Sequence, residues 1–161
     1  MTFEFAEGGV GRFHGIHPVL EAILRAAAAD PWERCPEGSA RLLPPPGEDA
    51  ELIEDWEDHV RPELREGFSK ARSVVEEDLG AMTQNKKGDW SLTIPPDHTD
   101  AWLTTLNAVR LALASEYEVT ETDLAAAEEE ADFSTPKGMA LLQVNLFGFM
   151  QECLIRAMSE G

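Results

Sequence analysis

The stretch that decides the fold is Thr99–Tyr117, TDAWLTTLNAVRLALASEY, whose apolar residues recur at the spacing of an α-helix. On a helical wheel they form one continuous arc that consists of Trp102, Leu103, Leu106, Val109, Leu113, Ala114 and Tyr117. Arg110 falls inside this arc, between Tyr117 and Leu103. Burying a guanidinium without a carboxylate or several acceptors is costly. Arg110 therefore needs an internal partner, a path for its head group to solvent, or a ligand.

The C-terminal segment is the second strongly helical part of the chain. It starts at Thr135-Pro136, and fourteen of the twenty residues from Met139 to Met158 are apolar, which predicts a helix that is buried on most sides. Such a helix is either the centre of the fold or half of a symmetric interface, because an exposed face this apolar would favour aggregation. We expect a homodimer formed through this helix, with an interface made by Leu142, Leu146, Phe149, Met150 and Cys153.

Glu152 on this last helix is the expected partner of Arg110, because an arginine fork matches a carboxylate in a bidentate pair. Asn107, one helical turn before Arg110, would complete the acceptors. The group is either an ion pair that fixes the register of the two helices or a binding site for an anionic ligand, and the ion pair is favoured. In the ion-pair interpretation, removing one partner costs roughly 3 to 5 kcal/mol.

Residues 1–16 predict a β-hairpin at one edge of the fold. Short alternating segments, Thr2–Phe5 and Val10–His14, flank the turn pair Gly8-Gly9. The alternating segment Trp90–Ile94 is a candidate third strand for this hairpin.

Further helices are predicted after Pro18, over Leu64–Met82, and after Thr120, where Asp123 three residues later resembles a capping box. Pro62, just before the second of these, either kinks the chain or starts a new helix one position later.

Residues 33–48 are rich in proline and glycine, which predicts a stiff surface loop within one domain. Residues 1–161 are therefore expected to form a single domain. Its fold class is mainly α: a helical bundle of five or six helices with a small N-terminal β-hairpin.

The composition argues against several kinds of partner. With 31 acidic and 13 basic side chains, the chain has a formal charge of -18, which opposes binding to nucleic acid. The longest apolar stretch, Met139–Met150, is interrupted by polar residues and is short for a membrane span. Cys35 and Cys153 form no C-x-x-C pair, and no signal peptide precedes them, so we expect free thiols and a cytoplasmic protein.

The sequence contains no recognisable catalytic or metal-binding motif. His14 and His17 have H-x-x-H spacing without a third ligand, and neither a nucleophile elbow nor a complete phosphate-binding motif is present. We therefore expect no catalytic residue, no metal site and no cofactor, and interpret the chain as a non-enzymatic protein-interaction or regulatory module. The alternative is a small-molecule or metal-dependent activity in a pocket around Arg110 and Glu152.

The chain also resembles an uncharacterised bacterial family known as domain of unknown function DUF2017. The resemblance is carried by RLLP at Arg41–Pro44, AWLTTLNAVRLALA at Ala101–Ala114, the VTETD that follows, and LFGFMQECL near the end. It implies an all-helical cytoplasmic protein. Genes of the family often lie near that of a Clp protease adaptor, which implies an association with protein quality control. The resemblance supplies no catalytic residues.

Overall fold

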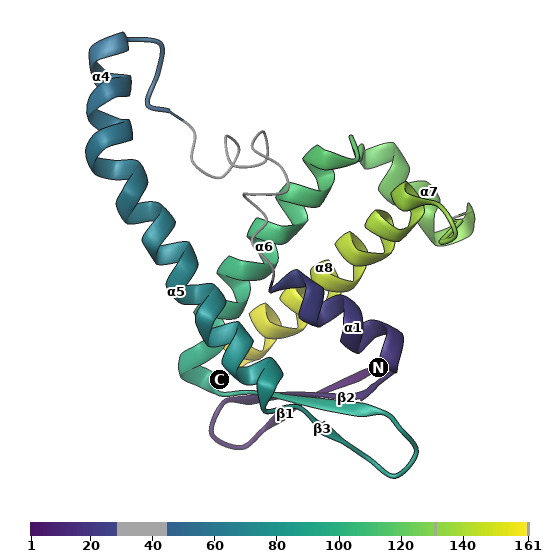
Figure 1. The fold of residues 1–161 in the computed structure, drawn as a ribbon. Coiled ribbons are helices and arrows are strands. Elements are labelled where there is room, and N and C mark those ends of the chain that lie inside the picture. The colour runs from purple at the N-terminus through teal and green to yellow at the C-terminus, as the bar shows by residue number, and fades with distance from the viewer. Residues whose placement is uncertain (29–44, 131, 161) are drawn as a thin grey trace.

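A four-stranded antiparallel sheet with helices on one of its faces forms the fold (Figure 1). The structure is a computed structural model, and it describes residues 1–28, 45–130 and 132–160. The strands are β1 (Thr2–Ala6), β2 (Val10–Ile16), β3 (Thr83–Gln84) and β4 (Trp90–Ile94), in the order β1-β2-β4-β3.

The predicted hairpin and its third strand are both confirmed. Gly8 and Gly9 have φ angles of 83° and 84° in the turn between β1 and β2, a backbone region that glycine enters without a steric penalty. β4 pairs with β2, with Leu92 opposite Phe13. The two-residue strand β3, which pairs with β4, has no signal in the sequence.

The helices in the described residues follow two pairs of strands, β1 with β2 and β3 with β4, along the chain. They are α1 (Pro18–Ala27), α4 (Ala50–Asp55), a π-helical turn (Trp56–Val60), α5 (Arg61–Gly80), a 3-10 turn (Pro96–His98), α6 (Thr99–Glu116), α7 (Glu121–Glu130) and α8 (Pro136–Glu160).

The start of α7 is capped as the sequence predicts. The backbone N–H of Thr120 donates to the Asp123 carboxylate, and the Asp123 N–H donates to the Thr120 hydroxyl. Thr135 caps α8 in the same manner through the N–H of Gly138.

One hydrophobic core joins the sheet to the helices. Its largest fully buried side chains come from β2 and β4 as well as from α1, α6 and α8: Phe13, Ile16, Leu24, Leu92, Ile94, Trp102, Leu106, Phe147, Met150 and Leu154. The mainly α fold class is confirmed. The expected bundle is not, because the sheet supplies one wall of the core and the helices do not enclose a core of their own.

The expected surface loop at residues 33–48 lies largely outside the described residues, as do Cys35 and the RLLP segment. Only its end, from Pro45, is described; there the chain is exposed, and the Asp49 carboxylate caps α4.

Candidate docking groove between the helical arm and α6

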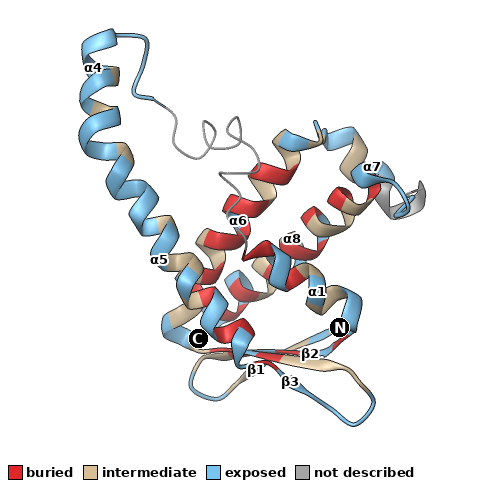
Figure 2. Ribbon diagram, viewed as in Figure 1, coloured by how far each residue is buried: buried red, intermediate tan, exposed pale blue. Residues whose placement is uncertain are grey.

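α4, the π-helical turn and α5 form one continuous helical rod, and its first two thirds stand away from the rest of the molecule (Figures 1 and 2). We call residues 50–71 of this rod the arm. No residue of α4 or of the π-helical turn is buried, and the buried residues of α5 are Val75, Asp78 and Leu79, near its C-terminal end. Within the described residues, the buried part of the rod is thus its C-terminal end, beyond the arm.

Pro62 accounts for the π-helical turn in the arm. A proline inside a helix has no N–H to donate, and its ring collides with the carbonyl four residues earlier. The chain widens by one residue instead, so that the N–H of Arg61 donates to the carbonyl of Trp56, five residues earlier. The new helix expected after Pro62 is not found, since α5 begins one residue before it, at Arg61, and continues the rod.

The arm carries apolar side chains that nothing in the described structure covers. Leu52, Val60 and Leu64 are 53%, 43% and 42% exposed, and Ile53 and Trp56 are half-buried. A solvent-facing helix normally places polar residues at such positions. An exposed apolar series of this length is typical of a surface that meets another molecule.

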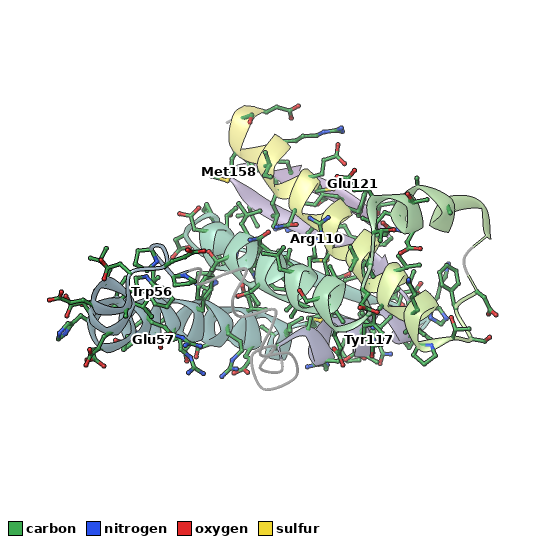
Figure 3. The ribbon with its side chains drawn as sticks, turned by 90° about the horizontal axis from the view of Figure 1, so that it is seen from above. Trp56, Glu57, Arg110, Tyr117, Glu121 and Met158 are labelled. Carbon is green, nitrogen blue, oxygen red and sulfur yellow. The ribbon has the colours of Figure 1, made fainter. Side chains whose placement is uncertain are left out.

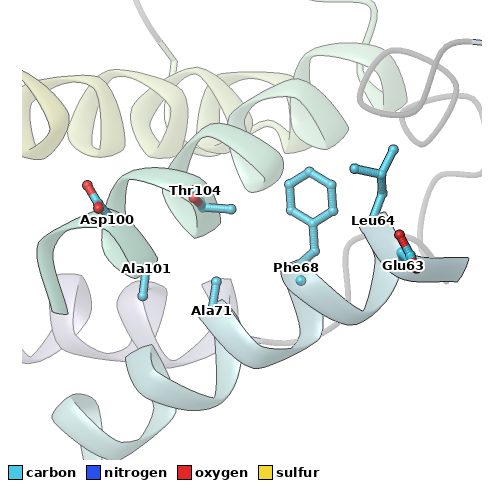
Figure 4. Close-up of a pocket in the computed structure, with 8 residues that line it drawn as sticks. Glu63, Leu64, Phe68, Ala71, Asp100, Ala101 and Thr104 are labelled. Carbon is cyan, nitrogen blue, oxygen red and sulfur yellow. The ribbon is translucent and has the colours of Figure 1, made fainter. Parts of the chain in front are cut away.

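A groove runs between the base of the arm and the start of α6. Its volume is about 380 Å³, within the range of ligand pockets. Leu64 and Phe68 extend from α5 into the space beside α6, while the carboxylates of Glu63 and Asp100 lie at opposite ends of the row (Figure 4). The lining residues are Glu63, Leu64, Gly67, Phe68, Ala71, Asp100, Ala101 and Thr104.

A buried polar cluster fixes α5 against α6 beyond the base of this groove. The carboxylate of Asp78, only 7% exposed, accepts hydrogen bonds from Trp102 Nε1 at 2.8 Å and from His98 Nδ1 at 2.9 Å. Because the cluster ties α5 to the first turns around α6, it sets the direction in which the arm leaves the body. Sequence reasoning did not find it, although His98 and Trp102 are four residues apart and so share one helical face.

The Asp78–His98 pair predicts a specific pH dependence of stability. The hydrogen bond to Asp78, with added attraction from Asp97 and Glu77, raises the pKa of His98 above 6.5. A raised pKa in the folded state means that the stabilisation is complete below the unfolded pKa and is lost as the pH rises through the folded one. We therefore expect the difference in unfolding free energy between wild type and His98→Gln to be largest at acidic pH and to shrink as the pH rises through the raised pKa of His98.

Urea unfolding of both proteins over a series of pH values measures that difference, in which the titration of the other groups cancels. A difference that stays constant, or that grows with pH, would contradict a stabilising protonated His98.

Arg110 lies at the seam between α6 and α8 (Figure 3), but its partner differs from the expected one. Its Nη1 donates to the Gln151 side-chain oxygen at 2.6 Å. Glu152 is exposed and pairs with Arg156 one turn later, while Asn107 is also exposed. The predicted Arg110–Glu152 pair is therefore wrong, since Glu152 lies one residue further around α8.

Gly148 makes room for the guanidinium of Arg110. A Cβ atom at this glycine would lie 3.2 Å from Nη2, so the head group rests close to the backbone of α8. Burial lowers the pKa of Arg110, and its Nε is buried without a hydrogen-bond partner. Within the described residues, then, Arg110 has one neutral partner and no carboxylate.

This geometry changes what removing Arg110 should do. Arg110→Met keeps the apolar stem, removes a poorly compensated charge and leaves Gln151 able to bond to water, so the unfolding free energy should change by less than about 1 kcal/mol. Chemical unfolding of the purified variant measures this change. A loss near 3 to 5 kcal/mol would mean that Arg110 has a buried carboxylate partner after all.

The residues expected at a dimer interface do not share one surface. Met150 is fully buried and Leu146 is 8% exposed, both within the core of the single chain. Leu142 and Cys153 are half-buried, and Phe149 is 43% exposed. Leu146 and Met150 are thus corrected to core residues, because they face the sheet and α6. The homodimer itself stays a prediction.

α8 is long and apolar enough to cross a membrane by length and composition alone, unlike the shorter stretch considered from the sequence. Its apolar residues here pack against the sheet and α6, and core helices of water-soluble proteins meet the same test. Burial raises the pKa of the Cys153 thiol on this helix.

The histidines in the described residues have different surroundings, and His59 is exposed on the arm. His14 contacts Ser91 and Glu4, His17 caps α1, and His98 belongs to the Asp78 cluster. Within the described ranges no group of three or more His, Cys, Asp and Glu side chains has the arrangement of a metal site.

These observations define a mainly α-helical protein in which helices cover one face of a small antiparallel sheet and one helix projects as an arm. The chain belongs to the family described as Domain of unknown function (DUF2017), whose profile matches residues 16–158. No curated protein and no solved structure matches the chain. The family resemblance noted in the sequence is therefore confirmed, and the matched region includes the arm, the groove and strand β4.

Proposed function

We propose that this protein is a non-enzymatic protein-interaction module and that the arm and the groove beside α6 form its docking site. The supporting observation is the exposed apolar series on the arm, which continues directly into the groove through Leu64 and Phe68. Desolvating such side chains against a partner is favourable by roughly 25 cal/mol for each Å² that both surfaces bury.

We also propose a cellular location, a class of partner and an oligomeric state, each of which rests on the sequence. The module acts in the cytoplasm, and its partner belongs to protein quality control, as the gene neighbourhood of the family suggests. The chain also forms a homodimer through the exposed remainder of α8, around Phe149. The alternative, a ligand pocket at Arg110 and Glu152, gains no support, because these residues point to different partners and neither lines the groove.

Co-purification from the native cell with a matched pair of variants tests the proposal. Leu52→Gln/Leu64→Gln removes two exposed apolar side chains from the arm, and Phe5→Gln/Val19→Gln removes two of similar exposure from β1 and α1. After mild cross-linking, we expect the tagged wild type and the β1/α1 variant to recover the same protein, and the arm variant to lose most of it.

All four positions are exposed, so the melting temperatures of the variants should stay close to that of the wild type, which separates lost binding from lost folding. Equal recovery by both variants, or recovery of the chain alone by the wild type, would overturn the docking function.

A further inference from the structure

The charge of the arm indicates the chemistry of its partner. The arm, residues 50–71, carries seven acidic residues, all of them exposed, against two arginines and Lys70, which pairs with Glu66. One of the two arginines, Arg61, is already paired with Glu57 on the same helix, at 2.8 Å. The arm therefore carries a net negative charge alongside its apolar side chains.

The groove is negatively charged as well. Glu63 on α5 and Asp100 on α6 both line it, and none of its eight lining residues is basic. Neither carboxylate belongs to an ion pair in the described structure. A partner that fills the apolar floor of the groove would bring these two carboxylates out of bulk water. That step is favourable only if the partner supplies cations beside its apolar side chains.

The shape of the surface favours a helix as the docked element. The apolar side chains run from Ile53 to Ala71, about 27 Å at the helical rise of 1.5 Å per residue. The arm is itself a helix, whose backbone groups bond internally, so an extended peptide would find no strand edge to pair with. An amphipathic helix satisfies its own backbone and can place ridges of side chains into the groove.

A second copy of the chain is a poor occupant of this site. Its own arm carries the same acidic excess, so an arm seated against a second arm would bring like charges together. Like charges brought close together across an interface cost several kcal/mol.

Resting on the docking function proposed above, we infer that the arm and groove receive a cationic amphipathic helix from a partner protein. Its length is about 15 to 20 residues, its apolar side chains occupy the groove at Leu64 and Ala71, and its lysines or arginines flank that stripe and face Glu63, Asp100 and the acidic residues of the arm.

Two synthetic peptides of about 18 residues serve as probes. Both carry leucine at helical spacing, and the remaining positions are mainly lysine in one and mainly glutamate in the other. Binding to the full chain is followed by fluorescence anisotropy. We expect the leucine/lysine peptide to bind at least about tenfold more tightly than the leucine/glutamate peptide, and to weaken several-fold between about 50 and 300 mM salt.

Two matched charge-reversal variants test which part of the protein attracts the leucine/lysine peptide. Glu54→Lys/Asp58→Lys alters the arm, whereas Glu7→Lys/Glu160→Lys makes the same change in net charge at exposed sites near the sheet and at the end of α8. We expect the arm reversal to weaken binding of the leucine/lysine peptide about tenfold and the distant reversal to weaken it less than about twofold. Equal weakening by both would overturn the inference, because the attraction would then come from total charge.

The peptide measurements distinguish a wrong cationic preference from a wrong docking site. If both peptides bind equally well and Leu52→Gln/Leu64→Gln weakens both, the docking site stands and its cationic preference is refuted. If Leu52→Gln/Leu64→Gln changes neither binding, the docking site itself is refuted. Sedimentation of the wild type and this variant adds a third result: a dimer that the variant converts to monomer would show that a second copy occupies the arm.

Discussion

Replacing Asp78 by alanine is expected to lower the free energy of unfolding by about 3 kcal/mol. The carboxylate is buried and accepts hydrogen bonds from Trp102 Nε1 and His98 Nδ1. Without it, the indole N–H of Trp102, which is 1% exposed, stays buried with no partner. An unpaired buried donor costs its full desolvation penalty, whereas an ordinary surface change costs less than about 0.5 kcal/mol.

Two further variants make this expectation specific. Glu77→Ala removes the neighbouring, exposed carboxylate and should cost less than about 0.5 kcal/mol. Asp78→Asn keeps an oxygen that can accept from Trp102 and should lose less stability than Asp78→Ala. Urea unfolding of the three proteins gives the comparison. Equal stability of Asp78→Ala and Glu77→Ala would mean that the cluster contributes no net stability.

The second large effect is expected at Gly138, in the first turn of α8. A Cβ atom here would lie 1.8 Å from the carbonyl oxygen of Asp132, so the turn before the helix would have to move. That turn also positions Thr135, whose hydroxyl caps α8. We expect Gly138→Ala to destabilise the protein by about 2 kcal/mol, even though alanine is the better helix former by about 1 kcal/mol.

Gly67 in α5 is the matched control, because no atom lies within 4 Å of the position that its Cβ would take. Gly67→Ala should therefore gain up to about 1 kcal/mol from helix propensity alone. Thermal unfolding of the two variants should move the melting temperature in opposite directions. A change of the melting temperature in the same direction for both variants would show that the turn at Asp132 can move without loss of stability.

The sequence predicted the helices and strands well where one face of an element is buried. Thr99–Glu116, the C-terminal helix and the hairpin with its third strand all carry the expected periodicity and appear as predicted. The same reasoning predicted the helix over Leu64–Met82 but not that its first turns stand away from the core. Leu64 belongs to the same helical series as Val75 and Leu79, yet Leu64 is 42% exposed and the other two lie in the core. Periodicity identifies an apolar face but not what covers it.

The partner of Arg110 was missed for a related reason. Neighbouring positions on a helix differ by about 100° in direction, so a choice between Gln151 and Glu152 depends on how α6 and α8 are rotated against each other. That rotation is set by packing around Phe147 and Met150, which no single helix reveals. The cluster of Asp78, His98 and Trp102 likewise depends on where two helices meet. Contacts within one helix can be predicted from the spacing of residues in the sequence, whereas contacts between two helices cannot.

The packing contact between β2 and α8 has a consequence for biosynthesis. Gly11 leaves just enough room for a methyl group of Leu154, so residues near opposite ends of the chain share one interior. Contacts between such distant residues must close a very long loop before they yield any stabilisation. On the ribosome, the surface of β2 at Gly11 therefore stays without its α8 contact until that helix has emerged. Nascent chains halted before that point should expose this part of the core to chaperones and proteases.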